Sequence, residues 1–134
     1  MRTSPETERE ILKPGNTDLC EVYYDDMRRA ESLKERLPSE EVFLSASRML
    51  KASSDPVRVK LLYALSHSEL CVCEMAHLLG MSLPAVSHHL RLLRDADLVQ
   101  YRKEGRLVFY CLRDEHLNGA VKHLVNIFAE REGR

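Results

Sequence analysis

Apolar residues recur at intervals of three or four through most of this chain, a period typical of amphipathic helices. Ser39, Asp55, Ser82 and Asp114 each precede such a run as an N-cap residue would, and Gly80 follows one. The expected fold is therefore mainly α. The pattern predicts helices at about residues 26–36, 40–50, 56–67, 72–79, 83–95 and 115–130.

The period changes to two at Leu98, where apolar and polar residues begin to alternate. Two alternating runs, residues 98–101 and 107–111, are separated by Lys103-Glu104-Gly105-Arg106. Alternation interrupted by a turn that contains Gly predicts a small β-hairpin. Residues 18–25 hold β-branched and aromatic side chains, so we expect them to be short and extended.

A length of 134 residues predicts one folded domain with a tail. We expect a flexible N-terminal arm at residues 1–25, which begins with a segment rich in Glu, Thr, Ser, Pro and Gly, and a folded domain at residues 26–134. No run of about 18 apolar residues is available for a membrane span, and the N-terminus is polar. The chain is therefore expected to be cytoplasmic and to have no membrane partner.

The net charge of −1 is by itself unlike that of most nucleic-acid-binding domains. The charges are unevenly distributed along the chain, however. Residues 1–40 hold seven Lys/Arg and ten Asp/Glu, a net charge of −3, whereas residues 84–113 hold six Lys/Arg and three Asp/Glu, a net charge of +3. Because charge close to the phosphates sets the affinity for DNA, the second segment can form a DNA-binding surface despite the neutral total.

The helices predicted at residues 72–79 and 83–95, with a turn at Gly80 between them, match the layout of a helix-turn-helix motif. The second helix has a polar face that suits contacts in a major groove, and the hairpin after it has basic residues for adjacent phosphates. This arrangement is a winged helix; an ordinary helical pair with a solvated face is the alternative. The predicted DNA-contacting residues are Ser82, Pro84, Ala85, Ser87, His88, Arg91, Arg102, Lys103 and Arg106.

The chain has four cysteines, Cys20, Cys71, Cys73 and Cys111. With one intervening residue, Cys71 and Cys73 have poor geometry for a mutual disulfide, and closely spaced thiols in a cytosolic chain more often bind metal or sense redox state. A helix N-terminus favours both thiolates. Soft ions require three or four ligands, and Cys20 is the natural third. Cys111 is expected to pack as a small apolar residue.

Asp114, His116, His123 and Glu130 place carboxylates and imidazoles along the last predicted helix. They could contribute to a second metal site that the same helix of a second subunit completes. The alternative is that Asp114 is an N-cap and the histidines are simply exposed. His77, on the first helix of the helix-turn-helix, is expected to be an ordinary solvated residue.

Three segments closely resemble the ArsR/SmtB family of metal-responsive winged-helix repressors: Glu69-Leu-Cys-Val-Cys-Glu74, Ser87-His-His-Leu-Arg91 and Arg102-Lys-Glu-Gly-Arg106. The segment Asp18-Leu-Cys20-Glu resembles the arm of the cadmium- and lead-sensing CadC-type members. The resemblance covers about residues 18–130. It implies a homodimer whose first and last helices form the interface. It also implies that the apo dimer represses and that metal releases it from DNA.

Departures from the family pattern define the thiol set. The CadC-type arm has a second cysteine where this chain has Tyr24, which leaves three thiolates: Cys20, Cys71 and Cys73. The arsenic-sensing members have a further cysteine just after the box, where this chain has Met75-Ala76.

The last-helix zinc site of the family matches this chain at Asp114, His116 and Glu130. Ile127 occupies the remaining imidazole position, and His123 lies one turn earlier on the same face. The resemblance thus implies a second zinc site in which His123 would have to replace that imidazole.

The sequence predicts a metal-sensing transcriptional repressor and not an enzyme. As a homodimer it would bind double-stranded operator DNA and be released by cadmium, lead or zinc. Two alternatives keep the repressor but change the signal to oxidation of Cys71 and Cys73 or to arsenite. A structural-zinc interaction module without DNA binding is a further alternative. A thiol enzyme is disfavoured because the chain lacks a Cys-x-x-Cys motif and a Gly-rich anion loop.

Overall fold

The computed structural model describes residues 19–133 of the chain. The chain divides into two compact units, residues 1–39 and residues 40–134. Most of the arm predicted at residues 1–25 lies outside the described residues, so its boundary stays a prediction. No helix among the described residues is both long enough and apolar enough to cross a membrane.

Within residues 19–39, the described part of the first unit, the chain forms one helix, α2 (Arg28–Arg36), and no strand. The capping residue at the C-terminal end of α2 is Leu37, directly before Pro38, so the helix ends at the predicted residue 36. Arg28 donates hydrogen bonds to the carboxylate of Asp26 from Nε at 2.9 Å and Nη2 at 2.7 Å. These bonds lower the pKa of Asp26 to about 2. Residues 19–27 contain bends and no strand, so the expectation of an extended segment before α2 does not correspond to a regular strand.

The second unit begins with α3 (Glu40–Ser53) and α4 (Pro56–His67). Asp55 is the N-cap of α4, as predicted, and its carboxylate accepts the N–H groups of Val57 at 2.9 Å and Arg58 at 3.1 Å. The side chain of Arg58 in turn donates to the carbonyl oxygen of Ala52 at 2.6 Å. This bond fixes the end of α3 to the start of α4.

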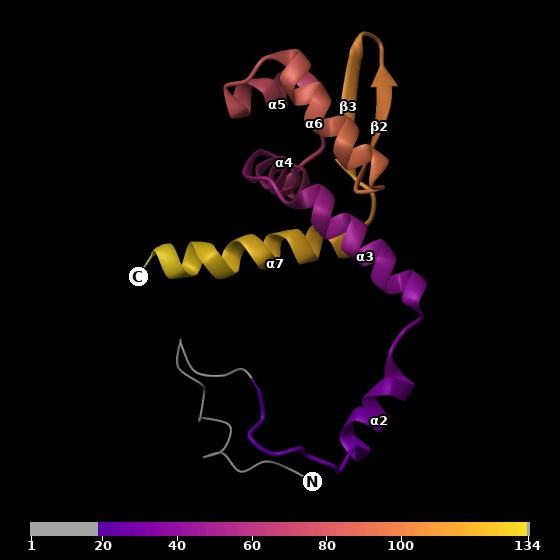
Figure 1. Cartoon of the computed structure of the whole chain (residues 1–134). Helices are drawn as coiled ribbons and strands as arrows, with labels where there is room; N and C mark the ends of the chain where they lie inside the picture. Colours follow the sequence, from indigo (N-terminus) through magenta and orange to yellow (C-terminus); the bar gives the residue numbers. More distant parts are fainter. Residues whose placement is uncertain (1–18, 134) are drawn as a thin grey trace. The chain divides into compact units, whose positions relative to one another are not determined.

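Helices α5 (Val72–Leu79) and α6 (Leu83–Asp95) have the predicted bounds, and α7 (Glu115–Glu132) ends two residues later than expected. The predicted hairpin is also present, as β2 (Val99–Glu104) and β3 (Leu107–Leu112). Its turn is shorter than the four residues expected, because pairing continues to Glu104 opposite Leu107. In Figure 1 the hairpin rises beside α6, and α7 crosses beneath α4.

The sequence did not predict the short strand β1 (Leu70–Cys71). It pairs antiparallel with β3, so the sheet has three strands in the order β1-β3-β2. Two residues are too few to show an alternating pattern, which is why periodicity could not find this strand. Its consequence is that the thiol segment belongs to the same sheet as the wing.

The core is formed by side chains from α4, α5, α6, α7 and the base of the hairpin. Aliphatic side chains dominate it, consistent with the absence of Trp. Its fully buried members are Leu61, Met75, Val86, Leu90, Leu93, Leu98 and Val99.

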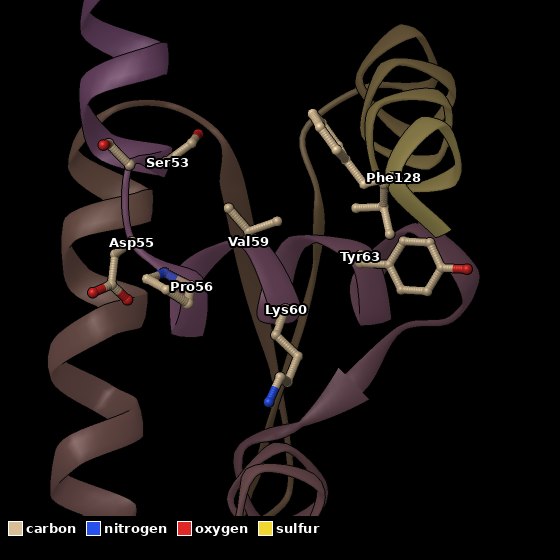
Figure 2. Close-up of a pocket in the computed structure, with 9 residues that line it drawn as sticks. Ser53, Asp55, Pro56, Val59, Lys60, Tyr63 and Phe128 are labelled. Atoms are coloured by element: carbon tan, nitrogen blue, oxygen red, sulfur yellow. The ribbon is translucent and has the colours of Figure 1, made fainter. Parts of the chain in front are cut away.

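An open apolar groove of about 830 Å³ lies between the start of α4 and the far end of α7. Figure 2 shows Phe128 of α7 on one side of this groove and Val59 and Tyr63 of α4 on the other. Phe128 is 57% exposed and Leu124, one turn earlier, is 50% exposed. The second unit therefore leaves part of its apolar surface uncovered along α7.

The Asp55 cap predicts a pH-dependent contribution to stability. Hydrogen bonds from the backbone, first that of Arg58, hold the pKa of Asp55 below its usual value of 3.8. A carboxylate with a lowered pKa stabilises the folded state above its unfolded pKa, and this contribution is lost as the pH falls through the folded pKa. We expect Asp55→Ala to be less stable than wild type at pH 7, with a difference that shrinks toward pH 3. Urea unfolding at one fixed protein concentration measures it. An equal difference at both pH values would contradict the cap's charge dependence.

Candidate nucleic-acid interface and thiol site

The helix-turn-helix is built by α5, a tight turn and α6. Gly80 has φ +63°, a left-handed conformation that favours Gly, and its N–H bonds to the carbonyl oxygen of His77 at 3.2 Å. Ser82 is the N-cap of α6, as predicted, and its hydroxyl accepts the N–H of Ala85 at 3.3 Å. The two caps fix where one helix ends and the next begins, which sets the orientation of α6.

Helix α6 has one buried face and one open face. Val86, Leu90 and Leu93 are completely buried and hold the helix on the core. Ala85 is half-buried, and the other predicted DNA-contacting residues of this helix and its cap are exposed: Ser82, Pro84, Ser87, His88 and Arg91. His89 is partly buried, with Nδ1 3.4 Å from Nη1 of Arg58.

Arg102, Lys103 and Arg106 are all exposed on the wing, but their surroundings differ. Arg106 lies in the turn and Lys103 near the end of β2. Arg102 lies further down the strand, with its guanidinium carbon 4.9 Å from the centroid of the Phe109 ring. The hairpin tip therefore presents two of the three predicted basic residues.

Two carboxylates neutralise Arg102. Its Nη2 donates to Glu69 at 2.5 Å, and its Nη1 pairs with Glu104. These hydrogen bonds, first the one that Arg102 donates to Glu69, raise the pKa of Arg102 above its usual value. The pair with Glu69 joins the segment before β1 to β2 across the intervening strand β3. The ion pair of Arg102 with Glu69 and its contact with Phe109 were not predicted from the sequence, because they depend on strand pairing rather than on local spacing.

Cys71 and Cys73 have different surroundings. Cys71 is 7% exposed, is the last residue of β1 and is the N-cap of α5. It forms a capping box with Glu74, whose carboxylate accepts the N–H of Cys71 at 2.9 Å. Cys73, two residues on, is exposed and lines a groove of about 510 Å³ along α5. The helix start thus has one buried and one accessible sulfur.

The other two cysteines lie apart from this helix start in the sequence. Cys111 on β3 is partly buried, and Nε2 of Gln100 lies 3.7 Å from its sulfur. Cys20 belongs to the first unit, where it is exposed in a small hollow with Tyr23, Tyr24 and Met27. All four thiols are free.

Residues predicted for a second metal site are spread along α7. Asp114 is the N-cap, and its carboxylate accepts the N–H of Leu117 at 2.9 Å. His116, His123 and Glu130 are exposed. Because an α-helix rises about 1.5 Å per residue, residues seven apart are separated by about 10 Å. One copy of α7 therefore cannot bring these three side chains to one ion.

Within residues 19–133, no three His, Cys, Asp or Glu side chains come together as a metal site. The donors at the start of α5 nevertheless suit a soft cation in their chemistry, since sulfur ligands select soft cations. A complete coordination sphere needs donors from elsewhere in the chain.

The short α5, the capped turn, the exposed polar face of α6 and the hairpin after it define a winged helix-turn-helix DNA-binding domain. Residues 55–101 match the family model described as bacterial regulatory protein, arsR family.

Two curated relatives extend this match. The chain is 42% identical over 106 residues to the cadmium resistance transcriptional regulatory protein CadC homolog of Staphylococcus aureus, covering 78% of this chain and 87% of that protein. It is 32% identical over 114 residues to the transcriptional repressor SmtB homolog of Synechocystis sp., covering 85% of this chain and 86% of that protein. The chain therefore belongs to the ArsR family and is a transcriptional regulator of the ArsR/SmtB type, not an enzyme.

A solved structure has the same architecture. The homodimeric winged helix-turn-helix DNA-binding domain of Mb0332 from Mycobacterium bovis, a possible ArsR-family regulator, superposes with a TM-score of 0.59 at 25% identity. The superposition covers 90% of this chain and 93% of that one.

The wing predicts a difference between its basic residues. Arg106→Ala removes a positive charge at the turn that has no ion-pair partner within residues 19–133, so we expect weaker binding by a similar factor on all DNA sequences. The slope of log affinity against log salt should flatten by about one unit per lost phosphate contact. Fluorescence anisotropy with specific and non-specific duplexes at several salt concentrations measures both. Lys122→Ala, a charge removed from α7 instead, is the control; a slope unchanged by Arg106→Ala would remove this residue from the interface.

Proposed function

We propose that this chain is a metal-sensing repressor that binds operator DNA as a homodimer and leaves it when a thiophilic cation binds Cys20, Cys71 and Cys73. The observation that carries the proposal is the position of Cys71, which is both the N-cap of α5 and a residue of the wing sheet. The named roles of the CadC and SmtB homologs in cadmium resistance and repression support it.

DNA binding is assigned to the exposed side of α6 and to the wing. Short polar side chains, an imidazole and a guanidinium on α6 suit base edges and phosphates in a major groove. The nine predicted contact residues comprise Ser82, Pro84, Ala85, Ser87, His88, Arg91, Arg102, Lys103 and Arg106. Lys103 and Arg106, which form no ion pair within the described part of the chain, supply positive charge for the phosphates, whereas Arg102 would first have to separate from Glu69 and Glu104.

A second copy of the chain is the proposed cover for the apolar surface of the second unit. Helices α3 and α7 expose large apolar side chains: Val42, Phe43, Leu44, Leu50, Leu124 and Phe128. An apolar surface of this kind marks an interaction site more often than a solvated face. The Mb0332 domain is described as homodimeric, which favours a copy of the same chain as the partner. In such a dimer the two α6 helices must match adjacent major grooves about 34 Å apart.

Strand pairing gives the thiol segment a route to the DNA-binding surface. Cys71 pairs with Phe109 on β3, and Phe109 pairs with Arg102 on β2. The Glu69–Arg102 ion pair spans the same three strands. A cation that binds the sulfur of Cys71 would therefore shift the wing and the start of α5 together. A coupling of about 1–3 kcal/mol is typical of such linkage and is enough to change operator occupancy.

Cadmium, lead and zinc are the proposed inducers, since thiolates select soft and borderline ions over magnesium or calcium. Three sulfurs suit lead or trivalent arsenic, whose lone pair favours a pyramidal three-coordinate site. Cadmium and zinc require a fourth donor. The redox alternative needs Cys71 and Cys73 to join, and the burial of one beside the exposure of the other does not favour it.

A second zinc site is proposed at Asp114, His116, His123 and Glu130, shared between two copies of α7. The helical rise prevents one copy from completing it. The N-cap hydrogen bond of Asp114 to Leu117 would have to be shared with, or given up to, the ion.

The thiol site predicts that operator binding and metal-driven release can be separated by mutation. Cys71→Ser and Cys73→Ser should keep apo operator binding and lose metal-driven release. Ser is itself a favoured N-cap residue, so Cys71→Ser can keep the start of α5 intact. Operator affinity with and without cadmium, lead and zinc is measured by anisotropy, and thiolate-to-metal ultraviolet absorption reports on the bound ion.

Cys111→Ser is the matched control and should behave as wild type in both measurements. Cys20→Ser should lose affinity for lead and cadmium. Wild-type metal affinity in Cys20→Ser would remove the arm from the ligand set and overturn the three-thiolate site.

The α7 site predicts a metal-specific effect. His116→Ala should abolish release by zinc and leave release by cadmium and lead intact, because only the carboxylate and imidazole donors are affected. The zinc-driven loss of operator binding is compared between variant and wild type. An equal zinc response in the two proteins means that these residues do not form a site.

A further inference from the structure

The accessible face of α5 holds a second metal-ligating side chain beside Cys73. Cys73 and His77 are four residues apart on this helix and both are exposed. Residues four apart lie on the same face with about 5–6 Å between their Cβ atoms. Both side chains line the same groove of about 510 Å³, together with Leu70, Glu74 and Leu78. The sulfur and the imidazole therefore border one open space.

We propose that His77 is a metal ligand that acts with Cys73, supplying the nitrogen donor that a three-thiolate site lacks. The inference rests on the proposed metal-sensing function and deepens it, because it assigns a ligand on which selectivity between ions depends. Two ligands at this spacing on one helical face can bind a single zinc ion, as paired histidines do in other proteins.

Of the other five histidines of the described chain, three make ring contacts and two, His116 and His123, lie on α7 away from this helix in the sequence. The ring of His67 packs against Tyr63 at 4.7 Å, and the rings of His88 and His89 are 5.9 Å apart. The ring of His77 makes no hydrogen bond, ion pair or ring contact within residues 19–133. Its nitrogens are therefore available in the groove.

Cys71 is placed less favourably than His77 for an ion in this groove. It is buried, and its backbone is fixed by strand pairing and by the bond to Glu74. One carboxylate oxygen of Glu74, Oε1, accepts that same bond. Cys73 and His77 are thus the donors that an arriving cation meets first, and Cys71 joins only if the start of α5 moves.

An imidazole changes which ions the site prefers. Zinc binds imidazole and thiolate together, whereas a soft ion such as lead gains little from a nitrogen donor. His77 should therefore raise the affinity for zinc, and for cadmium by a smaller factor, relative to lead.

The test compares His77→Asn with His67→Asn, which replaces an exposed histidine outside the groove. Zinc and lead affinities of the reduced full-length protein are measured by chelator competition. Histidine ring nitrogens are followed by ¹⁵N NMR during the zinc titration. We expect His77→Asn to lower the affinity for zinc by about ten-fold or more and the affinity for lead by much less. We expect the His77 ring signals to move on zinc addition and His67→Asn to match wild type. Apo operator binding should be unchanged in both variants.

Three results would overturn parts of this assignment separately. If His77→Asn binds zinc like wild type and the His77 ring signals do not move, while Cys73→Ser loses metal, then His77 is not a ligand and the thiol site stands. If the affinities for lead and zinc fall by the same factor, His77 contributes to the structure of the groove but does not determine which ion binds. If Cys71→Ser and Cys73→Ser both keep the metal response, the proposed function itself fails.

Discussion

Cys71 lies where the three-stranded sheet passes directly into α5, and its backbone serves both elements. It pairs with Phe109 on β3 and caps the helix with Glu74 as its partner. Cys71 therefore cannot move without disturbing both the wing, through β3, and the helix-turn-helix, through α5. Because of this constraint, a change at the Cys71 thiol affects the elements that bind DNA. The Glu69–Arg102 ion pair adds a second connection across the sheet. Surface ion pairs alone contribute little to stability, so the strand pairing is the stronger link.

The two exposed faces of the second unit serve different purposes for physical reasons. On α6 the residues opposite the buried stripe are small or polar, so water can solvate them until DNA replaces it. On α3 and α7 the exposed residues include Leu50 and Phe128, whose solvation is unfavourable. The first face suits a charged, hydrated ligand and the second suits another apolar protein surface. Homodimerisation and DNA binding therefore need not compete for the same side chains.

Charge in this protein is organised locally rather than by its total. The wing has three basic residues in sequence, but Arg102 is already neutralised by Glu69 and Glu104. Among the described residues, the wing's positive charge that no carboxylate neutralises therefore lies near the turn, at Lys103 and Arg106. The thiol segment shows the same principle for ligands: Cys71 and Cys73 are equivalent in the motif, yet only Cys73 faces an open groove, where His77 is its neighbour.

The sequence by itself determined the elements whose signals are local. The observed structure confirms the predicted N-caps at Asp55, Ser82 and Asp114, the helix end at Gly80 and the alternation in the hairpin. Each of these signals depends only on residues within a turn or a strand pair. It also indicated the polar face of α6 and the family. Only the tertiary structure decided what depends on residues distant in the chain. Strand β1, the pairing of Arg102 with Glu69, the burial of Cys71 and the groove shared by Cys73 and His77 all follow from how β3 and α5 pack.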